Sequence, residues 1–375
     1  MGLVFGHPQR KLITTPRFPM KTIFRLFCLL ALAGWAAVWS VSAQAPVGVG
    51  AQLYMGLTIT GVVGQAYLIE SATSLSPPDW TPLATLSLPR TPYLWMDTNS
   101  PATGRRFYRV GLSAFTPLVY IPAGTFTMGS PASEAERYPG ETQHQVTLTR
   151  GFWMGKYEVT QGEYLAVMGS NPSYFRNGID GSGNGGSGGV VTNELVHPVE
   201  QVSWADATDY CRKLTQKESA AGRIPEGWKY RLPTESEWEY GSRGGTTTAF
   251  SYGSALGSGM ANFDERYEYD SSVGTIDNPG GDYLGLTTEV GSYAANVFGL
   301  YDMHGNVWEW CQDWYGPYPG TETDPGGPAT GSARMIRGGS LEYGGVFCRS
   351  AYRGYTYPTS RGSNFGFRVV LAPGQ

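Results

Sequence analysis

One cysteine in the last tenth of the chain is the first candidate for chemistry. Cys348 lies in the stretch RGGSLEYGGVFCRSAYRGY, among glycines, aromatic residues and arginines. It could be a catalytic thiol supported by Ser340, with Arg349 and Arg353 nearby, because neighbouring cations lower the pKa of a thiol. It could also form a disulfide with Cys311, or be a buried free cysteine. These three interpretations stay open at this point.

The N-terminal segment predicts the compartment in which this cysteine works. From Met20 a positively charged start leads into an apolar stretch over residues 26–38 and a small-residue cleavage site at 41–43. This order is typical of a secretory signal peptide, here residues 1–43, with Met20 as a candidate true start. We therefore expect a secreted, periplasmic or cell-surface protein with no membrane span after cleavage. Cleavage removes Cys28 and leaves three cysteines, for which one disulfide and one free thiol is the default in an oxidising compartment.

Composition narrows the function classes. The chain has 375 residues, a formal net charge of −4, 52 glycines, 24 tyrosines and 11 tryptophans. The slightly acidic balance gives no reason to expect nucleic acid as a partner. After signal cleavage three histidines remain, His144, His197 and His304, and they are too scattered to predict a histidine-based metal centre. Nucleophile-elbow and Ser-His-Asp patterns are not evident.

Residues 48–113 predict a small all-β module. The stretches AQLYMGLTITG, QAYLIESA, TPLATLSL and RRFYRVGL alternate apolar and polar residues, and turn-forming segments separate them. The module resembles the small β-sandwich domains attached to many secreted bacterial proteins. Its expected role is spacing or attachment.

Three capping boxes predict helices in the rest of the chain. They pair Thr160 with Glu163, Ser203 with Asp206, and Thr234 with Glu237. In the second helix Ala207, Tyr210, Cys211 and Leu214 share one face, so we expect Cys211 to be buried. The segment GIDGSGNGGSGG, residues 178–189, has too few apolar side chains to bury and predicts a flexible surface loop.

Residues 117–372 resemble the formylglycine-generating enzyme family, also called sulfatase-modifying factor. The resemblance rests on LVYIPAGTFTMGS, FWMGKYEVTQGEY, PVEQVSWADATDYC, YRLPTESEWEYGSRGG, GLYDMHGNVWEWCQDWYG, RMIRGGS and NFGFRVV, which occur in this order. It implies an α+β, C-type-lectin-like fold with much irregular structure.

The same resemblance raises an objection to the family's chemistry. Its best-known members oxidise a cysteine of a client sulfatase with oxygen and a copper ion held between two cysteines. The second of these cysteines matches Cys348, but the first falls on Tyr343. Because a phenol is a poor substitute for a thiolate as a Cu(I) ligand, we do not expect copper. Two functions remain, so whether the chain is an enzyme stays open. It is either a divergent oxidoreductase acting on an exported protein or peptide client, or a non-catalytic binding module for protein, peptide or glycan.

Calcium is the metal that the sequence favours. Asp302 and Glu309 bracket a Gly-Asn turn, and such a loop can supply the oxygen ligands that a hard cation prefers. The resemblance implies two structural calcium sites. The first uses the side chains of Asp302 and Glu309 with the carbonyls of Gly305 and Val307; the second uses the side chains of Asn262 and Asp282 with the carbonyls of Phe263 and Leu284.

Overall fold

The computed structural model describes residues 3–4, 8–12, 41–43, 45–47, 51–60, 66–73, 81–87, 89–97, 106–112 and 117–374. The chain divides into two compact units, which we describe separately. The first comprises Met1–Val63, Ile69–Ala84 and Leu88–Gly111, and the second comprises Gly64–Leu68, Thr85–Ser87 and Leu112–Gln375.

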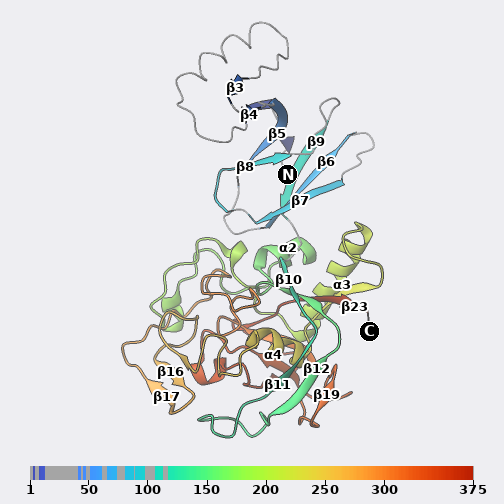
Figure 1. Ribbon diagram of the computed structural model, residues 1–375. Coiled ribbons are helices and arrows are strands. Elements are labelled where there is room, and N and C mark those ends of the chain that lie inside the picture. Colours follow the sequence, from blue (N-terminus) through green and yellow to red (C-terminus); the bar gives the residue numbers. More distant parts are fainter. Residues whose placement is uncertain are drawn as a thin grey trace. The chain divides into compact units, whose positions relative to one another are not determined.

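The first unit consists of strands in the described part of the chain (Figure 1). Leu57, Ile59 and Ile69 are buried in it, as the alternating pattern of these strands requires. Most of the predicted signal peptide lies outside the described residues, although two strands ahead of Met20 pair with this unit. One sheet has the order β1 (Leu3–Val4), β9 (Phe107–Leu112), β6 (Ala66–Ala72) and β7 (Thr81–Ser87); another has the order β2 (Pro8–Leu12), β5 (Ala51–Ile59) and β8 (Tyr93–Asp97); and β3 (Val41–Ala43) pairs with β4 (Ala45–Val47).

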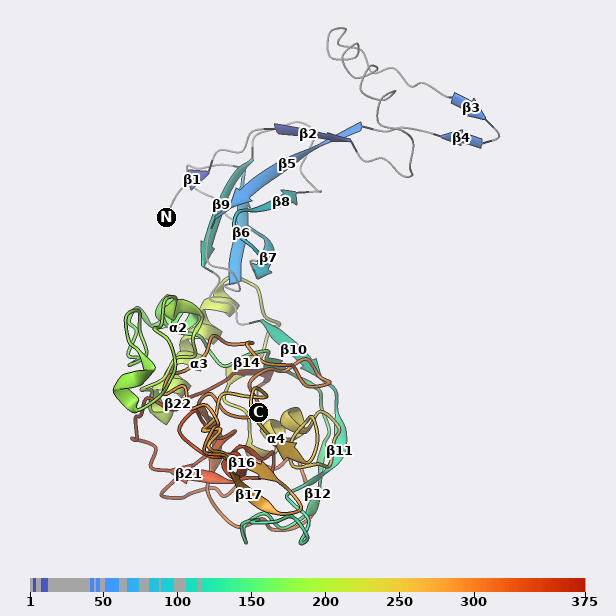
Figure 2. The ribbon, with the colours of Figure 1, turned by 90° about the vertical axis from the view of Figure 1, so that its left-hand side faces the viewer.

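The second unit combines small sheets with short helices and long irregular connections (Figure 2). Its sheets bring together strands from distant parts of the sequence, so the unit closes only when its last residues are in place. The sheet orders are β10 (Leu118–Ile121), β13 (Phe152–Gly155), β23 (Val370–Pro373), β14 (Trp228–Arg231); β11 (Gly124–Met128), β12 (His144–Leu148), β19 (Glu322–Thr323); β15 (Ala255–Leu256), β16 (Tyr267–Asp270), β17 (Gly274–Asp277); and β21 (Gly354–Thr356), β20 (Arg334–Arg337), β18 (Trp308–Trp314), β22 (Phe365–Gly366).

The three predicted helices are present and begin where their capping boxes predict. In each case the cap side chain accepts a backbone N–H and the acid three residues later accepts the N–H of the cap. Along the second helix the predicted face, including Cys211, is buried. In the described chain the helices are α2 (Gln161–Met168), α3 (Trp204–Ala220) and α4 (Glu235–Arg243), with 3-10 turns η1 (Gly181–Asn184), η2 (Glu194–Val196) and η3 (Gly345–Cys348).

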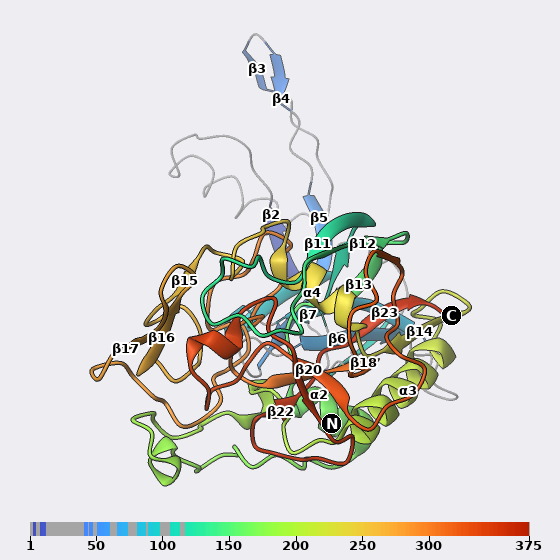
Figure 3. The same cartoon turned by 90° about the horizontal axis from the view of Figure 1, so that it is seen from below.

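Two large aromatic side chains lie at the centre of the second unit. Trp310 of β18 packs with residues of α3, and its indole N–H donates to the Val202 carbonyl at 2.9 Å. Trp238 of α4 packs in a neighbouring cluster with Met154 and Met303. Figure 3 shows α4 among the strands of this unit. These buried rings hold the sheets and helices together, because each buries a large apolar area.

The glycine-rich segment, residues 178–189, is folded against the rest of the unit, so the prediction of a flexible loop is wrong. Its backbone N–H groups at Ser187 and Gly188 donate to the carbonyls of Tyr283 and Leu284 at 2.6 and 3.0 Å. A Cβ added at Gly181 would lie 1.9 Å from the Leu284 carbonyl oxygen. Gly181, Gly186 and Gly188 are therefore needed for close backbone packing, which composition alone does not reveal.

Glu200, a buried carboxyl group in the connection between η2 and α3, predicts that stability depends on pH. Glu200 accepts the Phe175 N–H through Oε1 at 2.9 Å, while Oε2 is buried without a hydrogen-bond partner. Burial raises the pKa of Glu200 to about 7, above its unfolded value. Since the folded state then binds the proton more tightly than the unfolded state, stability falls as the pH rises from about 4.5 to about 7.

We expect Glu200→Gln to remove this dependence. The amide keeps the acceptor for Phe175 and carries no charge to desolvate. The free energy of unfolding in urea should rise by about 2 kcal/mol at pH 8 and remain near the wild-type value at pH 4. A variant that loses stability at pH 8 would show that the ionised carboxylate stabilises the fold.

Candidate functional site

Cys348 is a buried thiol at the end of η3. Its exposed fraction is 0%, and its sulfur lies 3.9 Å from the Gly344 carbonyl oxygen, a weak hydrogen bond. Burial raises the pKa of Cys348 to about 12, and a hydrogen bond from the backbone of Ser340 only partly opposes this. The thiol is therefore protonated at neutral pH, whereas nucleophiles and metal ligands need the thiolate.

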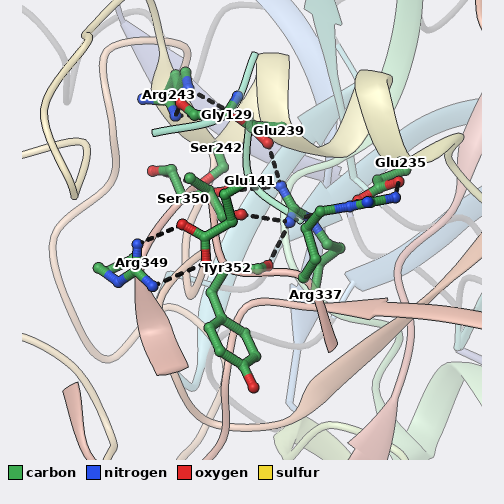
Figure 4. A network of polar contacts seen from close by, with 12 residues as sticks. Gly129, Glu141, Glu235, Glu239, Ser242, Arg243, Arg337, Arg349, Ser350 and Tyr352 are labelled. Carbon is green, nitrogen blue, oxygen red and sulfur yellow. Dashed lines mark hydrogen bonds and ion pairs between the residues drawn. The ribbon is translucent and has the colours of Figure 1, made fainter. Parts of the chain in front are cut away.

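The neighbouring arginines do not activate this thiol, which corrects the role considered for them in the sequence analysis. Arg349 forms an ion pair with Glu134 at 2.5 Å. It forms a second ion pair with Glu141 at 2.8 Å (Figure 4). Arg353 pairs with Glu235 at 2.7 Å. Their charges are already neutralised by these carboxylates, so they do not lower the pKa of the Cys348 thiol.

These pairs belong to a larger buried network that fixes the segment around Cys348. Arg337 of β20 donates to Glu239 of α4 at 2.5 Å and to the carbonyls of Ser350 and Tyr352. Arg243 donates to Glu239 through Nε at 2.9 Å and to the Gly129 carbonyl (Figure 4). The network ties α4 and β20 to the chain after Cys348 and acts as a scaffold.

Cys311 and Cys348 are not joined by a disulfide in the structure, which disfavours one of the three interpretations that the sequence leaves open. All three described cysteines, including Cys211, are free and buried. Cys311 of β18 packs with Trp238, whereas Cys348 packs with Phe250 in a different cluster. Each sulfur is thus surrounded by apolar side chains of its own cluster.

Ser340 and Tyr343 flank this thiol in the sequence and differ in exposure. The Ser340 side chain is fully buried, and its hydroxyl has no hydrogen-bond partner. Tyr343 is 37% exposed, and its ring contacts Trp308 and Phe347 with centroid distances of 5.4 and 5.2 Å. Tyr343 therefore belongs to an aromatic cluster at the surface.

A histidine that sequence reasoning set aside lies against the backbone of Cys348. His304 Nδ1 donates to the Cys348 carbonyl at 2.8 Å, and its Nε2 accepts the N–H of Ser251 at 3.1 Å. Burial lowers the pKa of His304 to about 4, so the ring is neutral at pH 7. A lone histidine in the sequence carries no signal for such a bracing role.

The loop predicted to bind the first calcium ion contains a buried ion pair. Glu309 of β18 receives two hydrogen bonds of 2.6 Å from Arg368, one to each carboxylate oxygen. The indole N–H of Trp238 also donates to Oε2 at 2.8 Å. Glu309 thus has both oxygens engaged by side chains.

Two further carboxyl groups lie close to this pair. Asp302 accepts the Gly291 N–H through Oδ2 at 2.6 Å, and its Oδ1 is buried without a partner. Glu158, which the sequence analysis missed, accepts from Asn306 at 2.9 Å. Burial, together with the carboxylates of Asp302 and Glu309, raises the pKa of Glu158 well above its usual range. Three acids therefore surround the single guanidinium of Arg368.

The loop predicted to bind the second ion is arranged differently. Asn262 has a buried Oδ1 without a partner. However, the Leu284 carbonyl accepts the Gly188 N–H, and Asp282 accepts from Ser187 at 3.3 Å. Phe263 packs in the apolar cluster around Phe250. The glycine-rich segment therefore already engages two of the four predicted ligands.

Comparison with known proteins decides the family. Residues 112–373 match the family described as "Sulfatase-modifying factor enzyme 1-like domain". The chain belongs to the formylglycine-generating enzyme family. The formylglycine-generating enzyme of Streptomyces coelicolor is 32% identical over 295 residues, which cover 67% of this chain and 88% of that protein. The chaperone protein LppX of Paenibacillus barcinonensis is also 32% identical, over 286 residues that cover 68% of this chain and 88% of that protein.

A solved structure has a similar fold. Treponema denticola variable protein 1 matches with a TM-score of 0.53 and 29% identity, covering 73% of this chain and 98% of that chain. The predicted α+β fold of the family is confirmed. Because relatives of equal identity carry the names of an enzyme and of a chaperone, family membership leaves the activity of this domain undecided.

The family resemblance implies copper and calcium, and the residues of this chain fit calcium but not copper. The residues do not fit copper, because Cys348 is buried and protonated and Tyr343 packs against Trp308. The first calcium loop does fit a cation: Asp302 has a free buried oxygen, and the local acids outnumber the arginine. Among the described residues no three Asp, Glu, His or Cys side chains are grouped closely enough to hold a metal, so backbone carbonyls would have to complete the site.

Proposed function

We propose that this domain is an exported binding module of the formylglycine-generating enzyme family, with a protein or peptide as its ligand. The observation that carries the proposal is the state of Cys348, which is fully buried, protonated at neutral pH and without a second thiol at Tyr343. Thiol oxidation needs an accessible thiolate. The divergent oxidoreductase remains the second candidate because of the 32% identity to an enzyme of the family.

Aromatic side chains near Cys348 support the binding function. Tyr343 and Tyr138 are 37% and 43% exposed. Tyr138 contacts Tyr352 edge to face at 4.9 Å, and Tyr352 contacts Phe347 at 5.1 Å. Half-exposed tyrosines on a rigid support are enriched at protein interfaces, because they bury a large area at a low cost in side-chain entropy.

Calcium and export complete the proposal. A calcium ion in the first loop, held by Asp302 with the carbonyls of Gly305 and Val307, would supply charge neutralisation and cross-link irregular backbone. Export rests on the signal-like segment before residue 43. In the part of the chain that the structure describes, no helix has the length and apolar character needed to cross a membrane.

Alkylation of the purified, exported protein tests the state of Cys348. We expect iodoacetamide to leave Cys348 unmodified in the native protein for hours and to modify it fully in denaturant without a reductant, because the thiol is buried but free. Peptide mass spectrometry reads both results. Cys211, which is equally buried on α3, serves as the matched control.

An activity assay separates the two candidate functions. We expect the copper-supplied protein to produce no aldehyde from a cysteine-containing peptide in the presence of oxygen. Rapid alkylation of Cys348 in the native protein, together with aldehyde formation, would refute the binding function and support the oxidoreductase. Peptide-array binding that is lost in Tyr343→Ala but kept in Tyr174→Ala, an exposed tyrosine on another segment, would support the binding module.

A further inference from the structure

A cavity of about 300 Å³ lies outside the region of Cys348. Its walls come from the turn between β12 and β13, the end of β14, the start of α4, the segment after β19 and the end of β23. Figure 1 shows β12 and β19, two of these strands, side by side. This volume is at the lower end of the range for small-molecule sites, so the cavity has room for one small ligand.

Two of the four charged residues in the cavity neutralise each other. Arg231 forms two hydrogen bonds with Glu237, of 2.6 and 2.7 Å. Glu237 also accepts the N–H of Thr234 at 2.9 Å. This pair belongs to the capping box of α4 and is held in place by the helix. Arg231 Nε is buried without a hydrogen-bond partner, so it lies out of reach of a ligand in the cavity.

The other two charges are opposite in sign, and neither forms an ion pair within residues 117–374. Arg150 is exposed, and within residues 117–374 no acid forms an ion pair with it. Asp324 accepts the N–H and the hydroxyl of Thr149, at 2.8 and 2.5 Å, but no cation of that range pairs with it. Arg150 and Asp324 both line the cavity, which therefore holds one positive and one negative group.

Apolar side chains form part of the remaining wall. Leu148, Phe152 and Ala372 are buried, and Pro325 and Pro373 also line the cavity. A ligand that packs against these side chains carries an apolar group, and a ligand small enough for this cavity that pairs with Arg150 and Asp324 carries both a carboxylate and an ammonium group. A free α-amino acid has these three parts on one carbon atom.

We propose that this cavity binds a free α-amino acid with an apolar side chain. Arg150 binds the carboxylate; Asp324 binds the ammonium group; and the side chain packs against Phe152 and Pro373. This inference does not rest on the proposed function, because the cavity shares no residue with the aromatic cluster near Cys348.

Calorimetric titration with three matched probes tests the inference. The probes are phenylalanine, N-acetylphenylalanine, which lacks the ammonium charge, and phenylalaninamide, which lacks the carboxylate. We expect phenylalanine to bind saturably. The affinity of each modified probe should be lower by about 10-fold or more, since each loses one charge-assisted hydrogen bond. Absence of saturable binding by phenylalanine, leucine and methionine overturns the inference, and so does equal binding of the three probes.

Three variants locate the binding on the cavity. Arg150→Gln and Asp324→Asn should each weaken phenylalanine binding about 10-fold. Asparagine tolerates the positive φ of 47° at residue 324 and still accepts from Thr149, so the fold is kept. Arg212→Gln, an exposed arginine on α3, is the control and should bind as the wild type does.

Each variant should also lose sensitivity to one probe. In Arg150→Gln, phenylalanine and phenylalaninamide should bind alike; in Asp324→Asn, phenylalanine and N-acetylphenylalanine should bind alike. The tripeptide Phe-Ala-Ala distinguishes a free amino acid from the N-terminus of a peptide, because its carboxylate lies far from its ammonium group. Binding of this tripeptide as tight as that of phenylalanine would refute the assignment of Arg150 to the carboxylate, as would wild-type affinity in Arg150→Gln.

Discussion

Glu309→Gln should destabilise the second unit by about 3 kcal/mol, because it removes the charge that pairs with the fully buried Arg368. The glutamine side chain also turns an N–H₂ group toward a guanidinium that needs two acceptors. The loss is expected at the lower end of the range for a broken buried pair, since Glu158 and Asp302 lie near enough to Arg368 to compensate for part of it. Urea unfolding followed by tryptophan fluorescence measures the effect.

The same unfolding experiment, repeated with calcium and with a chelator, tests whether Glu309 also binds calcium. An ion that binds the folded state raises its unfolding free energy by an amount that depends on ligand concentration. If Glu309 acts only through Arg368, the loss in Glu309→Gln is the same in chelator and in millimolar calcium. A larger loss in calcium would show that Glu309 is also a ligand, as the family resemblance implies.

Asp209→Asn on α3 is the matched control. Asp209 pairs with Arg212 and Lys213 at 2.6 and 3.0 Å, but all three side chains are exposed. Exposed pairs are screened by solvent, so the expected change is about 0.5 kcal/mol or less. If Glu309→Gln is as stable as Asp209→Asn in chelator, the buried ion pair does not contribute measurably to stability.

The contrast between helices and ion pairs explains what the sequence could predict. A capping box is a local pattern in which partners stand three residues apart, and all three predicted boxes are present. The partners of Arg349, in contrast, are Glu134 and Glu141, which lie 215 and 208 residues away in the sequence. No local pattern relates such residues, so the sequence suggested that Arg349 could act on Cys348, its neighbour in the chain.

The same reasoning applies to the metal loops. The sequence identified Asp302 and Glu309 because they bracket a recognisable turn. It missed Glu158, whose carboxylate reaches this turn from the segment before α2 through Asn306. Charge balance in a buried cluster depends on every group that the fold brings there, and that set is known only when the fold is known.

The second large effect is expected in the glycine-rich segment. Gly181→Ala should destabilise this segment by about 3 kcal/mol, because the new Cβ would lie 1.9 Å from the Leu284 carbonyl oxygen and both atoms are fixed by backbone. Relief requires η1 to move away and to release the hydrogen bonds of Ser187 and Gly188. Native-state hydrogen exchange at these two amides measures the local opening free energy.

Gly183→Ala in the same 3-10 turn provides the control. No heavy atom lies within 4 Å of its added Cβ, and its amide still donates to Asp180. Alanine there restricts the unfolded chain, so stability should be unchanged or should rise by about 0.5 kcal/mol. Fast exchange of the Ser187 and Gly188 amides in the wild type would show that the segment is flexible, as composition predicts. If Gly181→Ala abolishes the protection of these amides and Gly183→Ala keeps it, close packing against Leu284 requires glycine at position 181. A segment rich in glycine can then be ordered by backbone contacts that only glycine permits.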